Sequence, residues 1–182
     1  MRIALIATGS RGDVQPYIAL GKGLAQAGHA VRLAAPTNFE TLVRSHGLEF
    51  WPVRGDVQAA AESDEMRALL AKGNFLAITA QMAKLAQQAA LLWAEDCLAA
   101  CTGTELIIAG VGGLFIAIAI AEKLKLPVLQ AYLFPFTPTQ AFPNVLLPAS
   151  LARLGGGFNR ASHHAIRQAM WQGFRAGDAI MR

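Results

Sequence analysis

Five short apolar segments, separated by stretches with helical spacing, are the feature that most limits what this chain can fold into. Between the first two segments, apolar side chains recur at helical spacing from Val14 to Ala27, and Gly28 follows as a stop signal. Strands and helices that alternate in this way indicate right-handed crossovers in a parallel sheet. We therefore expect an α/β domain whose parallel strands lie near residues 2–8, 30–35, 48–53, 105–109 and 128–132.

Two regions interrupt this alternation within residues 1–150, which we treat as one domain. Residues 57–104 are rich in Ala, Leu and Gln and are expected to form a helical insert, broken near Gly73 and Asn74. Residues 133–148 contain four prolines and three phenylalanines, which excludes a helix or an ordinary strand.

The last residues, 151–182, are expected to form an amphipathic helix after a flexible break at residues 155–157. Its inner row consists of Ile166, Met170, Phe174 and Gly177. Residues 1–150 are electrically neutral, so the net charge of +4 comes from this segment. Its arginines leave three roles open: a solvated face, contact with a further domain, or a basic strip on an anionic membrane. The basic side chains are Arg153, Arg160, Arg167, Arg175 and Arg182, against a single Asp178.

Composition excludes several classes of protein. A hydrophobic content of 54% with 15% charged residues is not that of a disordered chain. The start of the chain is too short in apolar residues for a signal peptide, and residues 106–121 are too few to span a bilayer. Cys97 and Cys101 are expected to be buried and reduced, and no metal site is expected. A cytoplasmic location follows as an expectation, and nucleic-acid binding is not indicated.

The turn after the first strand, "ATGSRGDVQP" at residues 7–16, lies where ligands bind in an open parallel sheet. Its glycines match neither a phosphate-binding Walker loop nor a dinucleotide fingerprint. Asp13 has two interpretations. It caps a helix that begins at Pro16, or it is a general base exposed beside a substrate.

Two segments carry a resemblance to a known family. "TGSRGDVQPYIALGKGLAQAGHAVRLAAPTNFETLVRSHGLEF", residues 8–50, resembles the opening of the family 28 glycosyltransferases, and "PFTPTQAFP", residues 135–143, resembles a second family segment. The likeness is greatest to sterol and lipid glucosyltransferases and to related antibiotic glycosyltransferases. It implies the N-terminal half of a GT-B enzyme, a Rossmann-like sheet with helices on both faces that binds the acceptor. The family's C-terminal donor-binding domain has no counterpart before Arg182, so this half is expected to be inactive alone.

The resemblance also implies the chemistry, an inverting transfer of a hexose from a nucleotide-sugar, expected to be a UDP-sugar, without a further cofactor. Asp13 would be the catalytic base. The donor-facing loop would consist of Gly9, Ser10, Arg11 and Gly12. An apolar hydroxyl acceptor would contact Phe134, Phe136, Thr137 and Phe142. For Phe75 and Trp93 we favour an ordinary core role, and the four histidines add little.

A second class of function stays open. The chain could be a non-catalytic small-molecule or lipid-binding module, or a regulatory fragment, that keeps the pocket without the chemistry.

Overall fold

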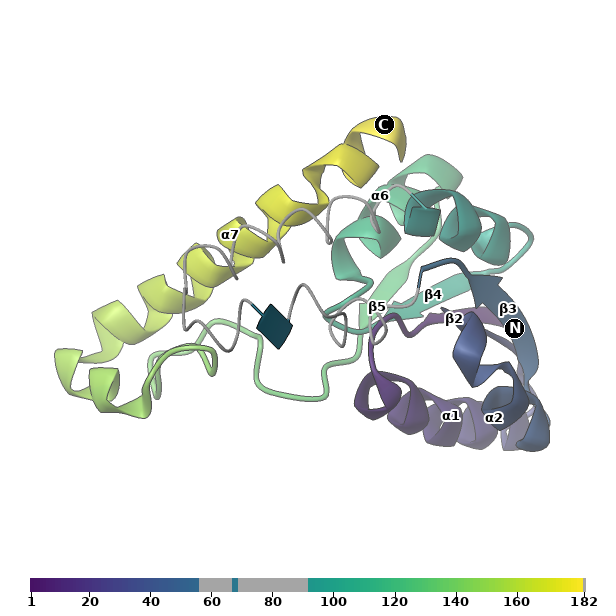
Figure 1. The fold of residues 1–182 in the computed structure, drawn as a ribbon, viewed down its shortest axis with the longest axis horizontal. Helices are drawn as coiled ribbons and strands as arrows, with labels where there is room; N and C mark the ends of the chain where they lie inside the picture. Colours follow the sequence, from purple (N-terminus) through teal and green to yellow (C-terminus); the bar gives the residue numbers. More distant parts are fainter. Residues whose placement is uncertain (56–66, 69–91, 182) are drawn as a thin grey trace.

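The computed structural model describes residues 1–55, 67–68 and 92–181, and it contains a five-stranded sheet (Figure 1). All four strand pairings are parallel, and the order across the sheet is β3-β2-β1-β4-β5. The five predicted strands are confirmed, each within two residues of its expected ends. Their bounds are β1 Arg2–Ile6, β2 Ala30–Pro36, β3 Glu49–Val53, β4 Leu106–Ala109 and β5 Val128–Gln130.

Helices cover both faces of this sheet, as the resemblance implied (Figure 1). Alternate side chains of β1 point to opposite faces, because successive residues of a strand alternate. Ile3 and Leu5 pack with α1 (Arg11–Gln26) and α2 (Glu40–Ser45), whereas Ala4 and Ile6 pack with α6 (Leu114–Leu124) and helical residues 92–101. Both faces of β1 are therefore core, which explains its unbroken apolar sequence.

The uncharged stretch 106–121 forms the predicted strand β4, then a turn and the first part of α6. The turn brings α6 very close to β1. A side-chain carbon at Gly113 would lie 2.5 Å from Ile6 Cγ2, and one at Gly112 would lie 2.6 Å from the Thr8 carbonyl oxygen. In the part of the chain that the structure describes, no helix is long and apolar enough to cross a membrane.

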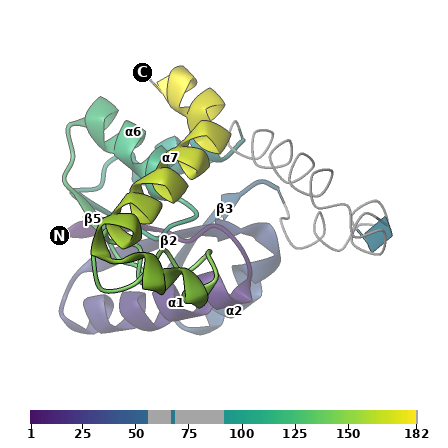
Figure 2. The same cartoon turned by 90° about the vertical axis from the view of Figure 1, so that its left-hand side faces the viewer.

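The middle turns of the last helix, α7 (Gly156–Met181), pack against α6, and its beginning extends away from the sheet (Figures 1 and 2). Ile166 and Met170 pack on a small cluster with Val111, Leu114 and Phe136, which confirms their inward position. The side chain of Phe174 and the surroundings of Gly177 lie outside what the structure describes. A short 3-10 helix, η2 (Ala149–Leu154), precedes α7.

Two boundary predictions were wrong. Helix α1 begins at Arg11 rather than at Pro16, because Ser10 and Asp13 cap it upstream of the proline. A 3-10 turn, η1 (Thr37–Phe39), runs directly into α2. The glycine break before α7 is shorter than expected. Only Gly155 has a left-handed φ, of 88°, and α7 starts at the next residue.

The predicted helical insert, residues 57–104, is described only in part. Residues 67–68 and 92–101 are helical, whereas the break at Gly73 and Asn74 and the side chain of Phe75 lie outside the described residues. Trp93 belongs to the core cluster, and its indole N–H donates to the Arg54 carbonyl at 3.0 Å. Cys97 and Cys101 are free and buried, as predicted, and burial raises the pKa of both thiols.

Candidate functional site

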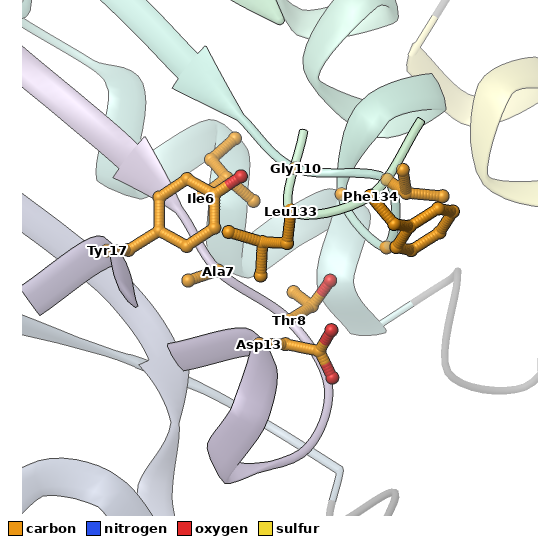
Figure 3. A pocket seen from close by; sticks show the side chains of 11 residues that line it. Ile6, Ala7, Thr8, Asp13, Tyr17, Gly110, Leu133 and Phe134 are labelled. Atoms are coloured by element: carbon orange, nitrogen blue, oxygen red, sulfur yellow. The ribbon is translucent and has the colours of Figure 1, made fainter. Parts of the chain in front are cut away.

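The candidate site lies beyond the carboxyl ends of β1 and β4. The chain crosses from β1 to β2 on one side and later returns to β4 on the other, so the strand order reverses between β1 and β4. Such a reversal leaves a crevice where open parallel sheets bind ligands. A small pocket occupies this place, and Figure 3 shows Thr8, Asp13, Tyr17 and Leu133 around it.

Asp13 is held at the start of α1 by Ser10, its partner in a capping box. The Ser10 backbone N–H and hydroxyl donate to the same carboxylate oxygen, Oδ2, at 2.8 and 2.9 Å. Among the described residues, Oδ1 accepts no hydrogen bond. One oxygen of Asp13 therefore anchors the helix, and the other is left to act on a ligand.

Gly9 makes this arrangement possible. Its φ of 134° lies in the region that side chains rarely adopt, and a methyl group there would overlap the Asp13 carboxylate. Ser10, Arg11 and Gly12 are exposed at the first turn of α1, on the rim of the site. Arg11 donates to the Gln15 side chain at 3.1 Å along the helix surface. The loop predicted to face the donor is thus accessible, and its donor contact stays a prediction.

Tyr17 connects α1 to the far side of the site, a role that sequence reasoning missed. Its side chain is buried, and its hydroxyl donates to the Ala131 carbonyl just beyond β5. Burial, and after it the charge of Asp13 and the nearby Tyr132, raise the Tyr17 pKa from 10.0 to about 12. Gly110 at the end of β4 leaves room for the phenol, because a side-chain carbon there would overlap it. No local signal marks this contact, since Tyr17 and Ala131 are 114 residues apart.

The aromatic segment, residues 132–142, forms the other wall of the site. An open hollow of about 700 Å³ is lined by residues that include all four predicted acceptor contacts, Phe134, Phe136, Thr137 and Phe142. Phe136 is fully buried, and its ring meets those of Tyr132 and Phe134 edge to face, 5.3 and 6.1 Å between centroids. Phe134, Thr137 and Phe142 are exposed. Phe136 therefore supports the wall, and the other three face outward.

Leu133 and Phe134 line both this hollow and the pocket that contains Asp13. Figure 3 shows the Thr8 hydroxyl and the Asp13 carboxylate on the side of the pocket opposite Leu133 and Phe134. The predicted base and the predicted acceptor contacts are thus neighbours in space, although more than 100 residues separate them in the sequence.

A buried polar network ties the aromatic segment to α7. The Ser162 hydroxyl accepts from the Asn144 N–H at 2.9 Å, and the Asn159 amide donates to the Gln140 carbonyl at 2.9 Å. His163 Nε2 lies 3.1 Å from the Phe142 carbonyl oxygen, and its Nδ1 lies 3.4 Å from the Asn144 amide. His163 thus has a structural role that the sequence did not indicate, because its hydrogen bond holds the backbone at Phe142. Its partners lie in an irregular segment about 20 residues earlier, which helical spacing cannot reveal.

Among the described residues, no group of three or more His, Cys, Asp or Glu could hold a metal ion. What the site offers is one carboxylate oxygen without a hydrogen bond among the described residues, an exposed helix start and a hydrophobic wall. This set suits the removal of a proton from a hydroxyl group held against an apolar surface.

Comparison with known proteins assigns this fold to a class. A parallel Rossmann-like sheet with this helix arrangement is the N-terminal domain fold of GT-B glycosyltransferases. The Streptomyces sp. SF2575 glycosyltransferase SsfS6, solved with thymidine diphosphate, matches 91% of this chain with a TM-score of 0.55. The match covers 45% of that protein at 23% sequence identity.

Residues 3–143 match the model of the glycosyltransferase family 28 N-terminal domain, and the chain belongs to that family. Two sterol 3-beta-glucosyltransferases are similar over 94% of the chain. The protein of Pichia angusta is 35% identical and that of Gibberella zeae 36% identical. This chain spans only 13% and 12% of the lengths of these two relatives.

Proposed function

We propose that the chain is the acceptor-binding domain of an inverting glycosyltransferase that moves a hexose from a nucleotide-sugar to a hydroxyl of a sterol or other apolar acceptor. The observation that carries the proposal is the free Oδ1 of Asp13 beside the aromatic wall. An apolar acceptor against Phe134 would place its hydroxyl near that oxygen. The names of the sterol relatives support this acceptor class.

In the proposed reaction, Asp13 takes the proton of the acceptor hydroxyl while the oxygen attacks the anomeric carbon of the sugar. The bond from that carbon to the nucleotide diphosphate breaks in the same step, so the configuration inverts. The exposed rim, Ser10 to Gly12, would face the donor. The thymidine diphosphate bound to SsfS6 supports a nucleoside diphosphate as leaving group, and we propose uridine as the nucleoside.

Asp13 has a structural role as well, so the test must separate the two. In Asp13→Asn the amide oxygen can still accept the two Ser10 hydrogen bonds, but the amide cannot take a proton. In Asp13→Ala both functions are lost. Both variants are made in a polypeptide where these residues are followed by a donor-binding domain.

We expect Asp13→Asn to keep its melting temperature and to lose about 10²-fold or more in sterol glucosylation, the usual scale for a general base. Asp13→Ala should lose activity and about 1 kcal/mol of stability as well. Full activity of Asp13→Asn would overturn the assignment of the base. The donor is tested by comparing UDP-glucose with TDP-glucose in the same assay.

The alternative function, a binding module without chemistry, makes a different prediction. Such a module would bind a fluorescent sterol in the aromatic hollow, but no donor would support transfer in the two-domain protein. Binding without transfer, for every UDP- and TDP-sugar tried, would favour this alternative.

A further inference from the structure

The end of the molecule farthest from the sheet combines exposed apolar side chains with unpaired positive charge. It consists of the loop after the aromatic segment, η2 and the first turns of α7, residues 145–160, which we call the tip (Figures 1 and 2). Three large apolar side chains are exposed there, Val145 at 43%, Leu146 at 60% and Leu154 at 55%. Exposed apolar side chains gathered in one place mark an interaction surface more often than scattered ones do.

The tip is a built structure rather than a loose loop. Asn144 and Asn159 lie at its two ends and are buried. Asn144 is hydrogen-bonded to Ser162 in α7, and Asn159 is hydrogen-bonded to Gln140 in the aromatic segment. Asn144 also accepts from the Leu146 N–H at 3.0 Å, which closes the turn that displays the leucine. These hydrogen bonds therefore hold the backbone of the tip in place, while the apolar side chains of the tip face outward.

The stretch of sequence that contains the tip carries charge of one sign. Residues 123–177 contain six basic side chains and no Asp or Glu. Arg167 and Arg175 lie over aromatic rings, those of Phe136 and Trp171. Arg153 and Arg160 lie at the tip, are exposed, and form no ion pair within the described part of the chain. Apolar side chains flanked by arginines that form no ion pair suit a lipid bilayer, because its interior is apolar and its headgroups can be anionic.

We infer that the tip docks the protein on anionic lipid bilayers. Val145, Leu146 and Leu154 enter the boundary between headgroups and acyl chains, and Arg153 and Arg160 bind lipid phosphates and carboxylates. The inference goes beyond the proposed glycosyl transfer and does not need it. It also gives the arginines of the last segment different roles. Arg167 and Arg175 contact aromatic rings within the protein, whereas Arg153 and Arg160 contact the lipid.

The test is sedimentation of the chain with vesicles of phosphatidylcholine, with and without about one third phosphatidylglycerol, at low salt. We expect binding to the anionic vesicles that fades as salt screens the charges. The double variant Arg153→Gln, Arg160→Gln should bind more weakly by about fivefold for each arginine removed. Leu146→Ser with Leu154→Ser should weaken binding at every salt concentration.

Matched controls lie on the opposite part of the molecule. Lys22→Gln with Arg44→Gln removes the same charge from α1 and α2, and Leu20→Ser removes an exposed leucine from α1. Both controls should bind within about twofold of the unchanged protein, because they leave the tip intact. Equal loss in the charge control and the tip variant would mean that net charge alone attracts the protein, and the inference would be wrong.

A second readout locates the contact. Cys97 and Cys101 are buried with raised thiol pKa values, so a cysteine introduced by Leu146→Cys reacts selectively with a polarity-sensitive dye. Its emission should shift to the blue with anionic vesicles, whereas the same dye at Leu20→Cys should not respond. No shift at position 146, or no difference between anionic and neutral vesicles, overturns the inference. If the two-domain protein binds vesicles through the tip but transfers no sugar, the inference stands and the proposed function is rejected instead.

Discussion

The two walls of the candidate site are built in opposite ways. The wall around Asp13 is tightly packed, because the glycines at positions 9, 110, 112 and 113 lie where any side chain would overlap a neighbouring atom. The aromatic wall is open and irregular, and only Phe136 is fully buried within it. The difference teaches that Asp13, the proposed base, is placed by backbone geometry, whereas the exposed side chains of the proposed acceptor wall can change without disturbing the fold.

The aromatic wall itself gives the largest expected contrast. Phe136→Ala should lower the free energy of unfolding by about 3–5 kcal/mol, because it removes a fully buried ring. Phe134→Ala, at an exposed position of the same wall, should leave stability nearly unchanged and weaken sterol binding about tenfold. Thermal melts and titration with a fluorescent sterol measure the two effects. If both variants lost stability equally, the wall would be one rigid core rather than a supported surface.

The packed wall is tested at Gly113. Gly113→Ala places a methyl group 2.5 Å from Ile6 Cγ2 at the start of α6, and we expect a loss of about 2 kcal/mol from overpacking. Gly157→Ala is the matched control, since a methyl group there meets nothing within 4 Å. Because alanine favours helices, the control should gain up to about 1 kcal/mol. Urea unfolding of both variants checks the prediction, and a neutral Gly113→Ala would show that the wall can relax.

Tyr17 ties one wall to the other, and its contribution depends on pH. The folded-state pKa is raised from 10.0 to about 12, so the protonated phenol stabilises the fold fully below pH 10. This stability is lost as pH rises through about 12. Tyr17→Phe should cost about 1 kcal/mol at neutral pH through the lost bond to Ala131. The difference between the two proteins should be constant up to pH 10 and shrink above it, and a difference that stays constant to pH 12 would exclude this account.

The smallest expected effect is a gain in stability at Thr8, behind Asp13. Its buried hydroxyl has no hydrogen-bond partner among the described residues, so Thr8→Val should raise stability by up to about 1 kcal/mol. Thr104→Val is the control, and it should lower stability, because the Thr104 hydroxyl donates to the Cys101 carbonyl at 2.7 Å. Denaturant midpoints of the two variants measure the contrast. A loss in both would mean that Thr8 also has a partner in solution.

Much of the fold could be predicted because it depends on local patterns. Apolar runs bounded by glycine and proline identified all five strands, and their spacing indicated parallel pairing. The start of α1 could not be placed correctly, because Pro16 is a stronger local signal than the capping box of Ser10 and Asp13. The two hydrogen bonds of that box allow the helix to begin five residues before the proline.

The site was predictable only where one segment carries its own signal. Asp13 and the phenylalanines stood out by residue type, and the two interpretations of Asp13 turn out to be compatible, because each uses a different carboxylate oxygen. Tyr17 and His163 were missed for the same physical reason. Each acts through a backbone carbonyl of a distant irregular segment, and such an acceptor has no signature in the sequence.

The most direct test of the central claim is a crystal structure of the chain with a sterol bound. Our account predicts that the sterol lies against Phe134 and that its hydroxyl oxygen lies within about 2.6–3.2 Å of Asp13 Oδ1. The Ser10 hydrogen bonds to Oδ2 should be unchanged. A sterol bound with its hydroxyl directed away from Asp13, or bound outside the aromatic hollow, would contradict the account.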